Sequence, residues 1–189
     1  MSDVERQIHH SIEVKLALIA QGGAEIIQRM GDIIADAIEA GNRFYVFGNG
    51  GSAADAQHIA GEFVGRFMKE RRGLPGMALT TDTSVLTAVA NDYSFADCFR
   101  RQVEALVREG DVTLAISTSG NAPNVIAACQ EAQRIGARTL GMSGKGGGKL
   151  VEVTNPCLVV PADTSARIQE SHITAAHIIC DIVEKRLFD

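Results

Sequence analysis

The sequence contains no tryptophan, few aromatic residues (5%) and no run approaching the ~18 apolar residues that a membrane-spanning helix requires. Residues 1–15 lack the basic-then-apolar layout of a secretory signal. Acidic residues (23) outnumber basic residues (18), and the formal net charge of -5 disfavours nucleic-acid binding through a basic surface. We therefore expect a cytoplasmic protein with no membrane partner and no nucleic-acid partner.

Cysteine motifs are missing as well. The four cysteines are far apart and form no C-x-x-C pair, so they carry no zinc-finger or redox signature. Each of them stands among apolar residues and is expected to be a small buried hydrophobic residue: Cys98, Cys129, Cys157 and Cys180. With 189 residues, 46% of them hydrophobic, the chain fits one compact domain.

Residues 1–42 carry the apolar pattern of two helices. Ile8, Ile12, Leu16 and Ile19 recur at helical spacing, and a second such stretch covers 26–38 after two adjacent glycines. These helices hold more apolar surface than one small sheet is expected to cover. We therefore interpret residues 1–42 as N-terminal helices that form an oligomer interface or pack across the edge of the core.

Residues 43–189 alternate short apolar runs with helical stretches. We expect strands at 44–47, 77–79, 112–116, 139–142 and 158–160. Helices are expected near 53–68, 84–89 with 95–107, 123–135 and 165–187. This alternation predicts an α/β fold, a three-layer α/β/α sandwich with a five-stranded parallel sheet. Ligands of such sheets bind in the loops at the carboxyl ends of the strands.

The loop after the first strand is rich in glycine and reads GNGGSA over residues 48–53. Glycines allow close backbone approach, and Ser52 with the following amides can face an anion at the helix start. Gly48, Gly50 and Ala53 also satisfy the dinucleotide fingerprint G-x-G-x-x-A. Its acidic partner should end the second strand about 20 residues on, whereas Asp82 lies beyond that spacing. A purely structural tight turn is a further alternative.

The loop after the third strand is rich in hydroxyl groups. Ser117, Thr118 and Ser119 precede a helix that starts near Pro123. Hydroxyl donors, backbone amides and the positive end of a helix together suit a phosphate monoester, and helix capping with turn chemistry is the alternative. A nucleotide triphosphate site is not expected in the glycine-rich segment 144–149, because Leu150 stands where the Walker pattern requires Ser or Thr.

Polar residues lie at ligand spacing on two predicted helices. His58 and Glu62 are four residues apart and share one helix face, and Gln169 and His177 end a similar ladder on the last helix. If the helices meet, they offer two imidazoles, a carboxylate and an amide oxygen, and imidazole with carboxylate suits zinc and similar ions. The alternative is that each histidine is a hydrogen-bonded core residue.

Three motifs occur together: GNGGSAADAQHIAGE at 48–62, STSGN at 117–121 and RIQE at 167–170, with His172 and His177 following. In this combination the chain resembles the bacterial phosphoheptose isomerases, a family of sugar-isomerase (SIS) domain proteins. The resemblance covers almost the whole chain, including the N-terminal helices. The hydroxyl-rich loop alone would indicate only a sugar-phosphate-binding domain of this superfamily.

The resemblance implies an activity and an assembly. The family converts sedoheptulose 7-phosphate to D-glycero-D-manno-heptose 7-phosphate through a cis-enediol, the first step towards the heptose of lipopolysaccharide core or other surface glycans. It implies a homotetramer with active sites at subunit interfaces, and one zinc per subunit. The zinc ligands would be His58, Glu62, Gln169 and His177, and Glu62 would be the catalytic base and His177 the catalytic acid.

The resemblance also implies a substrate-binding set. Ser52, Ser117, Thr118 and Ser119 match phosphate-binding positions, and Asn49 and Asp92 match positions that contact sugar hydroxyls. The full expected set is Asn49, Gly50, Gly51, Ser52, Asp55, Glu62, Asn91, Asp92, Ser117, Thr118, Ser119, Asn121 and Gln169. For Asp55 the alternative is a first-turn carboxylate favoured by the helix dipole.

Two departures from the family pattern are expected to shift affinity without loss of function. Ala122 stands where many members have serine after STSGN, and Ala166 stands where some members have aspartate before RIQE. The main alternative is a non-enzymatic relative that binds the replication initiator, and a sugar-phosphate sensor or a different sugar-phosphate isomerase is another. Because Glu62 and His177 are both present, we expect an enzyme.

Overall fold

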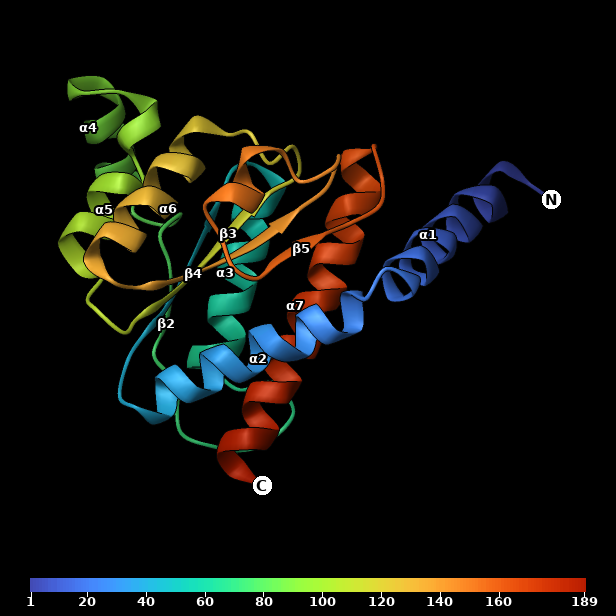
Figure 1. Ribbon diagram of the computed structural model, residues 1–189, viewed down its shortest axis with the longest axis horizontal. Helices are drawn as coiled ribbons and strands as arrows, with labels where there is room; N and C mark the ends of the chain where they lie inside the picture. The colour runs from blue at the N-terminus through green and yellow to red at the C-terminus, as the bar shows by residue number, and fades with distance from the viewer.

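The computed structural model describes residues 1–189, and it is an α/β sandwich around one sheet (Figure 1). Five parallel strands lie in the order β2-β1-β3-β4-β5. The strands are β1 (Phe44–Gly48), β2 (Gly76–Ala78), β3 (Val112–Ser117), β4 (Arg138–Ser143) and β5 (Cys157–Val159). The predicted five-stranded parallel sheet is therefore confirmed, and β2, β4 and β5 each start one residue earlier than expected.

The chain has seven α-helices and two short 3-10 helices besides this sheet. The α-helices are α1 (Asp3–Ala20), α2 (Gly23–Glu39), α3 (Gly51–Val64), α4 (Thr83–Asp92), α5 (Arg100–Leu106), α6 (Pro123–Ile135) and α7 (Ser165–Phe188). The 3-10 helices are η1 (Phe95–Asp97) and η2 (Gly148–Glu152). No helix is both long enough and apolar enough to span a membrane.

The alternation of side chains along β1 creates two cores. Phe44 and Val46 join an apolar cluster with α2, α3 and α7, whereas Tyr45 and Phe47 join a second cluster with α5 and α6. Successive residues of a strand point to opposite faces, so a strand buried on both faces must be apolar throughout. All five residues of β1 are buried.

The two N-terminal helices differ in their surroundings. Helix α2 packs along α7 and buries Met30, Ile34 and Ile38, so it belongs to the core. Helix α1 begins with a capping box between Ser2 and Glu5 and projects away from the body (Figure 1). The four apolar residues that predicted α1 are 48–62% exposed: Ile8, Ile12, Leu16 and Ile19. The surplus apolar surface expected for residues 1–42 therefore lies on α1.

Helix α3 ends earlier than the predicted 53–68, and the reason is a long-range ion pair. Gly65 caps the helix, and the carboxylate of Glu184 on α7 accepts hydrogen bonds from the amides of Phe67, Met68 and Lys69 at 2.7–3.1 Å. Arg71 pairs with the same carboxylate at 2.9 Å, and both side chains are almost fully buried. Amides that bond to a carboxylate in this way are not available to continue the helix.

The remaining boundaries and the cysteines follow the sequence with small differences. The expected helix over 95–107 is split into η1 and α5, whereas α6 and α7 lie where they were predicted. All four cysteines are free; three are buried, and Cys157 is half-buried.

Candidate active site

A pocket of about 140 Å³ lies at the carboxyl ends of β1 and β3, the sheet edge at which ligand binding was expected. We call it the hydroxyl pocket. Its lining includes Ile116 and Ala122. The other six lining residues belong to the predicted substrate-binding set: Asn49, Ser52, Ser117, Thr118, Ser119 and Gln169. Ser52 and Ser117 are only 3% and 6% exposed, so their hydroxyl groups are held within the fold.

The glycines of the first loop are required by close packing. A Cβ atom on Gly48 would lie 2.7 Å from the carbonyl oxygen of Ile116, and one on Gly51 would collide with the amide of Gln169. Gly50 has a φ of 57°, in the left-handed region that favours glycine. These glycines let α3 start directly behind β1 and let the Gln169 amide reach the loop.

A reciprocal amide pair joins the two loops of the hydroxyl pocket. Asn49 Nδ2 donates to Asn124 Oδ1 and Asn124 Nδ2 donates to Asn49 Oδ1, both at 2.9 Å. Asn124 is buried in the first turn of α6, behind Pro123. The sequence analysis missed Asn124, because asparagine near a helix start is ordinarily interpreted as capping. This pair fixes Asn49, a residue expected to contact sugar hydroxyls.

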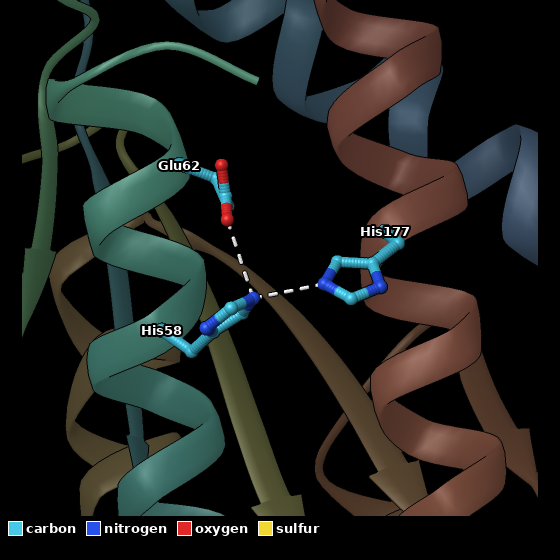
Figure 2. Close-up of side chains that lie close together, drawn as sticks. All are labelled: His58, Glu62 and His177. Carbon is cyan, nitrogen blue, oxygen red and sulfur yellow. Dashed lines mark hydrogen bonds and ion pairs between the residues drawn. The ribbon is translucent and has the colours of Figure 1, made fainter. Parts of the chain in front are cut away.

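Three ionisable side chains meet between α3 and α7, and we call them the His–Glu–His cluster (Figure 2). His58 Nε2 lies 2.8 Å from His177 Nε2 and 3.2 Å from Glu62 Oε1. The cluster is partly open to solvent, since the side chain of His58 is 49% exposed and that of Glu62 is 23% exposed. The two helices therefore meet at these three residues, which the sequence spacing left open.

The donor set of the His–Glu–His cluster fits a zinc ion. Its three ligand atoms lie within 4.8 Å of one another. One proton on His58 Nε2 cannot serve both His177 and Glu62 with good geometry, whereas a cation accepts a lone pair from each of the three atoms. Zinc takes imidazole nitrogen and carboxylate oxygen at about 2.0–2.2 Å, and catalytic zinc sites use three protein ligands.

Gln169 lines the hydroxyl pocket. It precedes His177 by eight residues on α7, a rise of about 12 Å along the helix. Its placement agrees with the expected contact with substrate. Within one chain, the structure does not bring it to the three other predicted zinc ligands.

Asp55 lies on α3 between the two parts of the site and is half-buried. Its Oδ2 atom is buried and has no hydrogen-bond partner. Burial raises the pKa of this carboxyl group, and nearby His58 opposes that effect. Asp55 is the fifth residue of α3 and lies outside its first turn, so the helix-dipole alternative does not apply. Its unpartnered carboxylate oxygen fits the expected substrate contact.

Seven predicted substrate residues lie outside the pocket lining. Gly50, Gly51, Asp55 and Glu62 are described above, and the other three are Asn91, Asp92 and Asn121. Asn91 and Asp92 are exposed at the end of α4, where Asn91 Nδ2 donates to Asp92 Oδ1 at 2.7 Å. The Asn121 side chain bonds within the fold: it donates to Ser119 O at 2.9 Å and accepts from Lys149 N at 3.1 Å. Asn121 therefore shapes the loop.

The two departures from the family pattern lie at different places. Ala122 lines the hydroxyl pocket and is the N-cap residue of α6, so a serine at this position would add a hydroxyl donor there. Ala166 is exposed in the first turn of α7.

Phe67 is a further residue of this site that the sequence analysis missed. Its ring stacks on His177 with the centroids 5.8 Å apart, and Glu184 holds its amide at 3.1 Å. The sequence shows only a phenylalanine five residues after Glu62. The hydrogen bond from the Phe67 amide to Glu184 of α7 places the ring over the His177 imidazole.

The fold and this pair of sites define a class of protein. The family model of the SIS domain matches residues 9–144, more than half of the chain. The phosphoheptose isomerase of Geotalea daltonii is 50% identical over 188 residues, covering 100% of this chain and 97% of that protein. The phosphoheptose isomerase of Aquifex aeolicus is 50% identical over 185 residues, and the match covers 98% of this chain and 96% of that protein.

Solved structures agree with the sequence relatives. Phosphoheptose isomerase from Neisseria gonorrhoeae superimposes with a TM-score of 0.89 at 39% identity, covering 96% of this chain and 97% of that chain. The enzyme from Francisella tularensis gives a TM-score of 0.91 at 34% identity, covering 98% and 100%. The chain belongs to the phosphoheptose isomerase family of SIS-domain proteins.

Proposed function

We propose that the chain is an aldose–ketose isomerase that converts sedoheptulose 7-phosphate to D-glycero-D-manno-heptose 7-phosphate. One observation carries the proposal: α3 and α7 join a hydroxyl-lined pocket to a carboxylate–imidazole cluster. The first part suits a phosphate monoester and the second suits proton transfer. Full-length relatives that are half identical in sequence are phosphoheptose isomerases.

The separation of the two parts suits a seven-carbon substrate. Ser52 and His58 are six residues apart on α3, a rise of about 9 Å. An open-chain heptose 7-phosphate extends roughly 9 Å from phosphorus to the C1–C2 bond, since its C–C bonds are about 1.5 Å long. A substrate with its phosphate in the hydroxyl pocket therefore brings C1 and C2 to the His–Glu–His cluster.

The proton transfers assign one role to each catalytic residue. The Glu62 carboxylate removes a proton from C1 of the ketose and returns one to C2, through a cis-enediol. His177 donates a proton to the C2 oxygen and accepts one from the C1 oxygen, which balances the reaction. Figure 2 shows Glu62 and His177 both directed towards His58 between α3 and α7, and we place C1 and C2 beside these three side chains.

We further propose that the His–Glu–His cluster holds one zinc ion per subunit. A bound zinc would polarise the substrate carbonyl and stabilise the negative charge that develops on its oxygen. The predicted fourth ligand, Gln169, is about 12 Å away along α7, so it would have to come from a second copy of the chain. The Phe67 ring shields one side of His177.

The same reasoning supports a homotetramer with active sites between subunits. The exposed apolar side chains of α1 need a partner surface, and residues 1–42 would supply the oligomer interface with 43–189 as the SIS domain. Asn91 and Asp92 are exposed and free to complete the site of a neighbouring copy. We place the enzyme in the cytoplasm, at the first step of heptose synthesis for lipopolysaccharide core or surface glycans.

The non-enzymatic alternatives are not favoured. Glu62 and His177 face the same space, and the relatives identical at about half of their positions are isomerases. Binding of a replication initiator or sensing of a sugar phosphate would leave this carboxylate–imidazole arrangement without a role.

The test is nuclear magnetic resonance of the purified protein with sedoheptulose 7-phosphate, in water and in D2O. We expect a heptose 7-phosphate aldose with solvent deuterium at C2, loss of the activity after chelation and recovery with zinc. Zinc content should fall from one per chain to near zero in His177→Ala. A folded oligomer that forms no product at any zinc loading would overturn the isomerase assignment.

A further inference from the structure

The glycine turn, residues 144–148, has no role in the reaction described above. It joins β4 to η2, and four consecutive residues have positive φ: Lys145 (50°), Gly146 (76°), Gly147 (92°) and Gly148 (56°). Such a run is rare for residues with a side chain. The segment superficially resembles a nucleotide-binding loop in the sequence, but the structure gives it other neighbours.

The glycine turn packs against the hydroxyl loop, residues 117–121. A Cβ atom on Gly148 would lie 2.7 Å from both Ser119 O and Asn121 Nδ2, and one on Gly120 would collide with the carbonyl oxygen of Gly147. Two backbone amides just after the turn bond to the loop: Lys149 N donates to Asn121 Oδ1 at 3.1 Å, and Leu150 N donates to Gly120 O at 2.9 Å. The turn and the loop therefore have no spare space between them.

The glycine turn is itself anchored to β4 and α7. Ser143 Oγ lies 3.2 Å from the carbonyl oxygens of both Gly144 and Gly147 and shares its one proton between them. His172, which is 1% exposed, lies with Nε2 3.1 Å from the carbonyl oxygen of Ser143. Because a carbonyl oxygen only accepts, His172 Nε2 carries the proton and donates it. A Cβ atom on Gly144 would also collide with Ile168 of α7.

We propose that the glycine turn is the positioning element of the hydroxyl loop, with Gly148 as its contact point and Ser143 and His172 as its anchors. It holds Ser117, Thr118 and Ser119 in the geometry that receives the phosphate group. This inference rests on the proposed function and adds to it. The phosphate group is remote from C1 and C2, so its binding energy is the same before and during the proton transfers, and its loss raises KM.

Gly148→Ala and Gly146→Ala form a matched pair. Both positions have positive φ, so alanine causes comparable backbone strain at each, but a Cβ atom on Gly146 meets nothing within 4 Å. We expect Gly148→Ala to raise KM for sedoheptulose 7-phosphate by about tenfold and to leave kcat within about twofold, because one or two charge-assisted hydrogen bonds are misplaced. Gly146→Ala should change KM by less than about twofold.

A second readout separates positioning from general damage. Binding of inorganic phosphate, followed by the amide resonances of residues 117–121, should weaken about tenfold in Gly148→Ala and stay unchanged in Gly146→Ala. The thermal unfolding temperature should fall further in Gly148→Ala than in Gly146→Ala, because only the Gly148 Cβ atom collides with the loop, so phosphate binding is compared at a temperature at which both variants are folded. Equal KM values and equal phosphate affinities in the pair would overturn the inference.

Ser143→Ala keeps the inference testable if Gly148→Ala does not fold. Removal of one buried hydroxyl should raise KM by about threefold at unchanged kcat, and an unchanged KM would count against the anchoring role. A different result would contradict the proposed function: the wild-type protein would bind phosphate but form no aldose. In that case the phosphate titrations of the glycine variants still decide whether the turn positions the loop.

Discussion

The hydroxyl pocket and the His–Glu–His cluster are built by different means. The pocket consists of turns and short side chains at strand ends, and Ser52 and Ser117 are almost fully buried. The cluster stands on the faces of α3 and α7, and His58 is half exposed. The hydroxyl pocket is therefore formed within one chain, whereas the His–Glu–His cluster is open on the side where we propose that a metal ion, the substrate and a second copy bind.

The largest effect on activity is expected at the His–Glu–His cluster. Glu62→Gln removes the proposed base but keeps the shape of the side chain, and we expect kcat to fall by about 10³-fold with KM within about threefold. Deuterium incorporation at C2 should fall in parallel, since both depend on the same proton transfer. Turnover and exchange are measured by nuclear magnetic resonance.

Zinc content must be measured in the same samples, because Glu62 is also a proposed ligand. The matched control is Glu70→Gln, an exposed carboxylate 3.7 Å from Arg66. Its kcat should stay within about twofold, since exposed ion pairs contribute little. A Glu62→Gln enzyme with wild-type turnover would remove the distinction between the two ends.

The next effect is on stability. Glu184→Gln leaves Arg71 buried without its partner charge, and we expect the free energy of unfolding to fall by about 3 kcal/mol or more. Burial raises the pKa of Glu184, but hydrogen bonds from Met68, Lys69 and Phe67 and from Arg71 outweigh burial and hold it below its usual value. The measurement is urea denaturation at pH 7.

Asp181→Asn is the control for Glu184→Gln. Asp181 pairs with Lys185 at 2.6 Å on the surface of the same helix, and its loss should cost no more than about 1 kcal/mol. A loss of equal size in the two variants would mean that the buried pair does not organise the end of α3 that carries Glu62.

The fold was predictable because its strands and helices are encoded by local apolar patterns. Buried strands such as β1 and β3 are continuous apolar runs, and the helices that cover them keep a helical period. The end of α3 was not predictable, because the bonds that stop it come from Glu184, more than a hundred residues away. The split between η1 and α5 was missed because the apolar spacing continues across it.

The two ends of the site also differ in how far the sequence predicts them. The hydroxyl pocket follows from motifs that are local in sequence, so its serines and Thr118 were found. The meeting of His58 with His177 depends on the packing of two distant helices, and spacing alone left it open. The Asn121 side chain accepts a hydrogen bond from the backbone amide of Lys149. No local sequence pattern connects Lys149 to the loop, so this role of Asn121 was not predictable.

The third expected effect tests the scaffold behind the hydroxyl pocket. Burial lowers the pKa of His172 to about 4, against the opposing hydrogen bond to Ser143. In the unfolded chain the pKa is about 6.5, so the unfolded state binds the proton first. This histidine therefore stabilises the fold fully above pH 6.5, and the contribution is lost as the pH falls towards 4.

Between pH 7 and pH 5 the free energy of unfolding should fall by about 2 kcal/mol from this group. His172→Gln keeps a hydrogen-bond donor but does not titrate, so its stability should change less over the same range. Urea denaturation at the two pH values measures both. Identical pH dependence in the two proteins would mean that His172 is not the buried neutral group that holds Ser143.

The smallest of these effects is expected at the hydroxyl pocket. Ser52→Ala removes one hydroxyl from the hydroxyl pocket, and we expect KM for sedoheptulose 7-phosphate to rise by about tenfold with kcat within about twofold, because a hydrogen bond to a charged phosphate is worth about 1.5 kcal/mol. The exposed Ser84 on α4 supplies the control, and Ser84→Ala should leave both constants unchanged. A fall in kcat at constant KM in Ser52→Ala would place this serine at the reacting carbons and contradict the division of the site into a binding end and a reacting end.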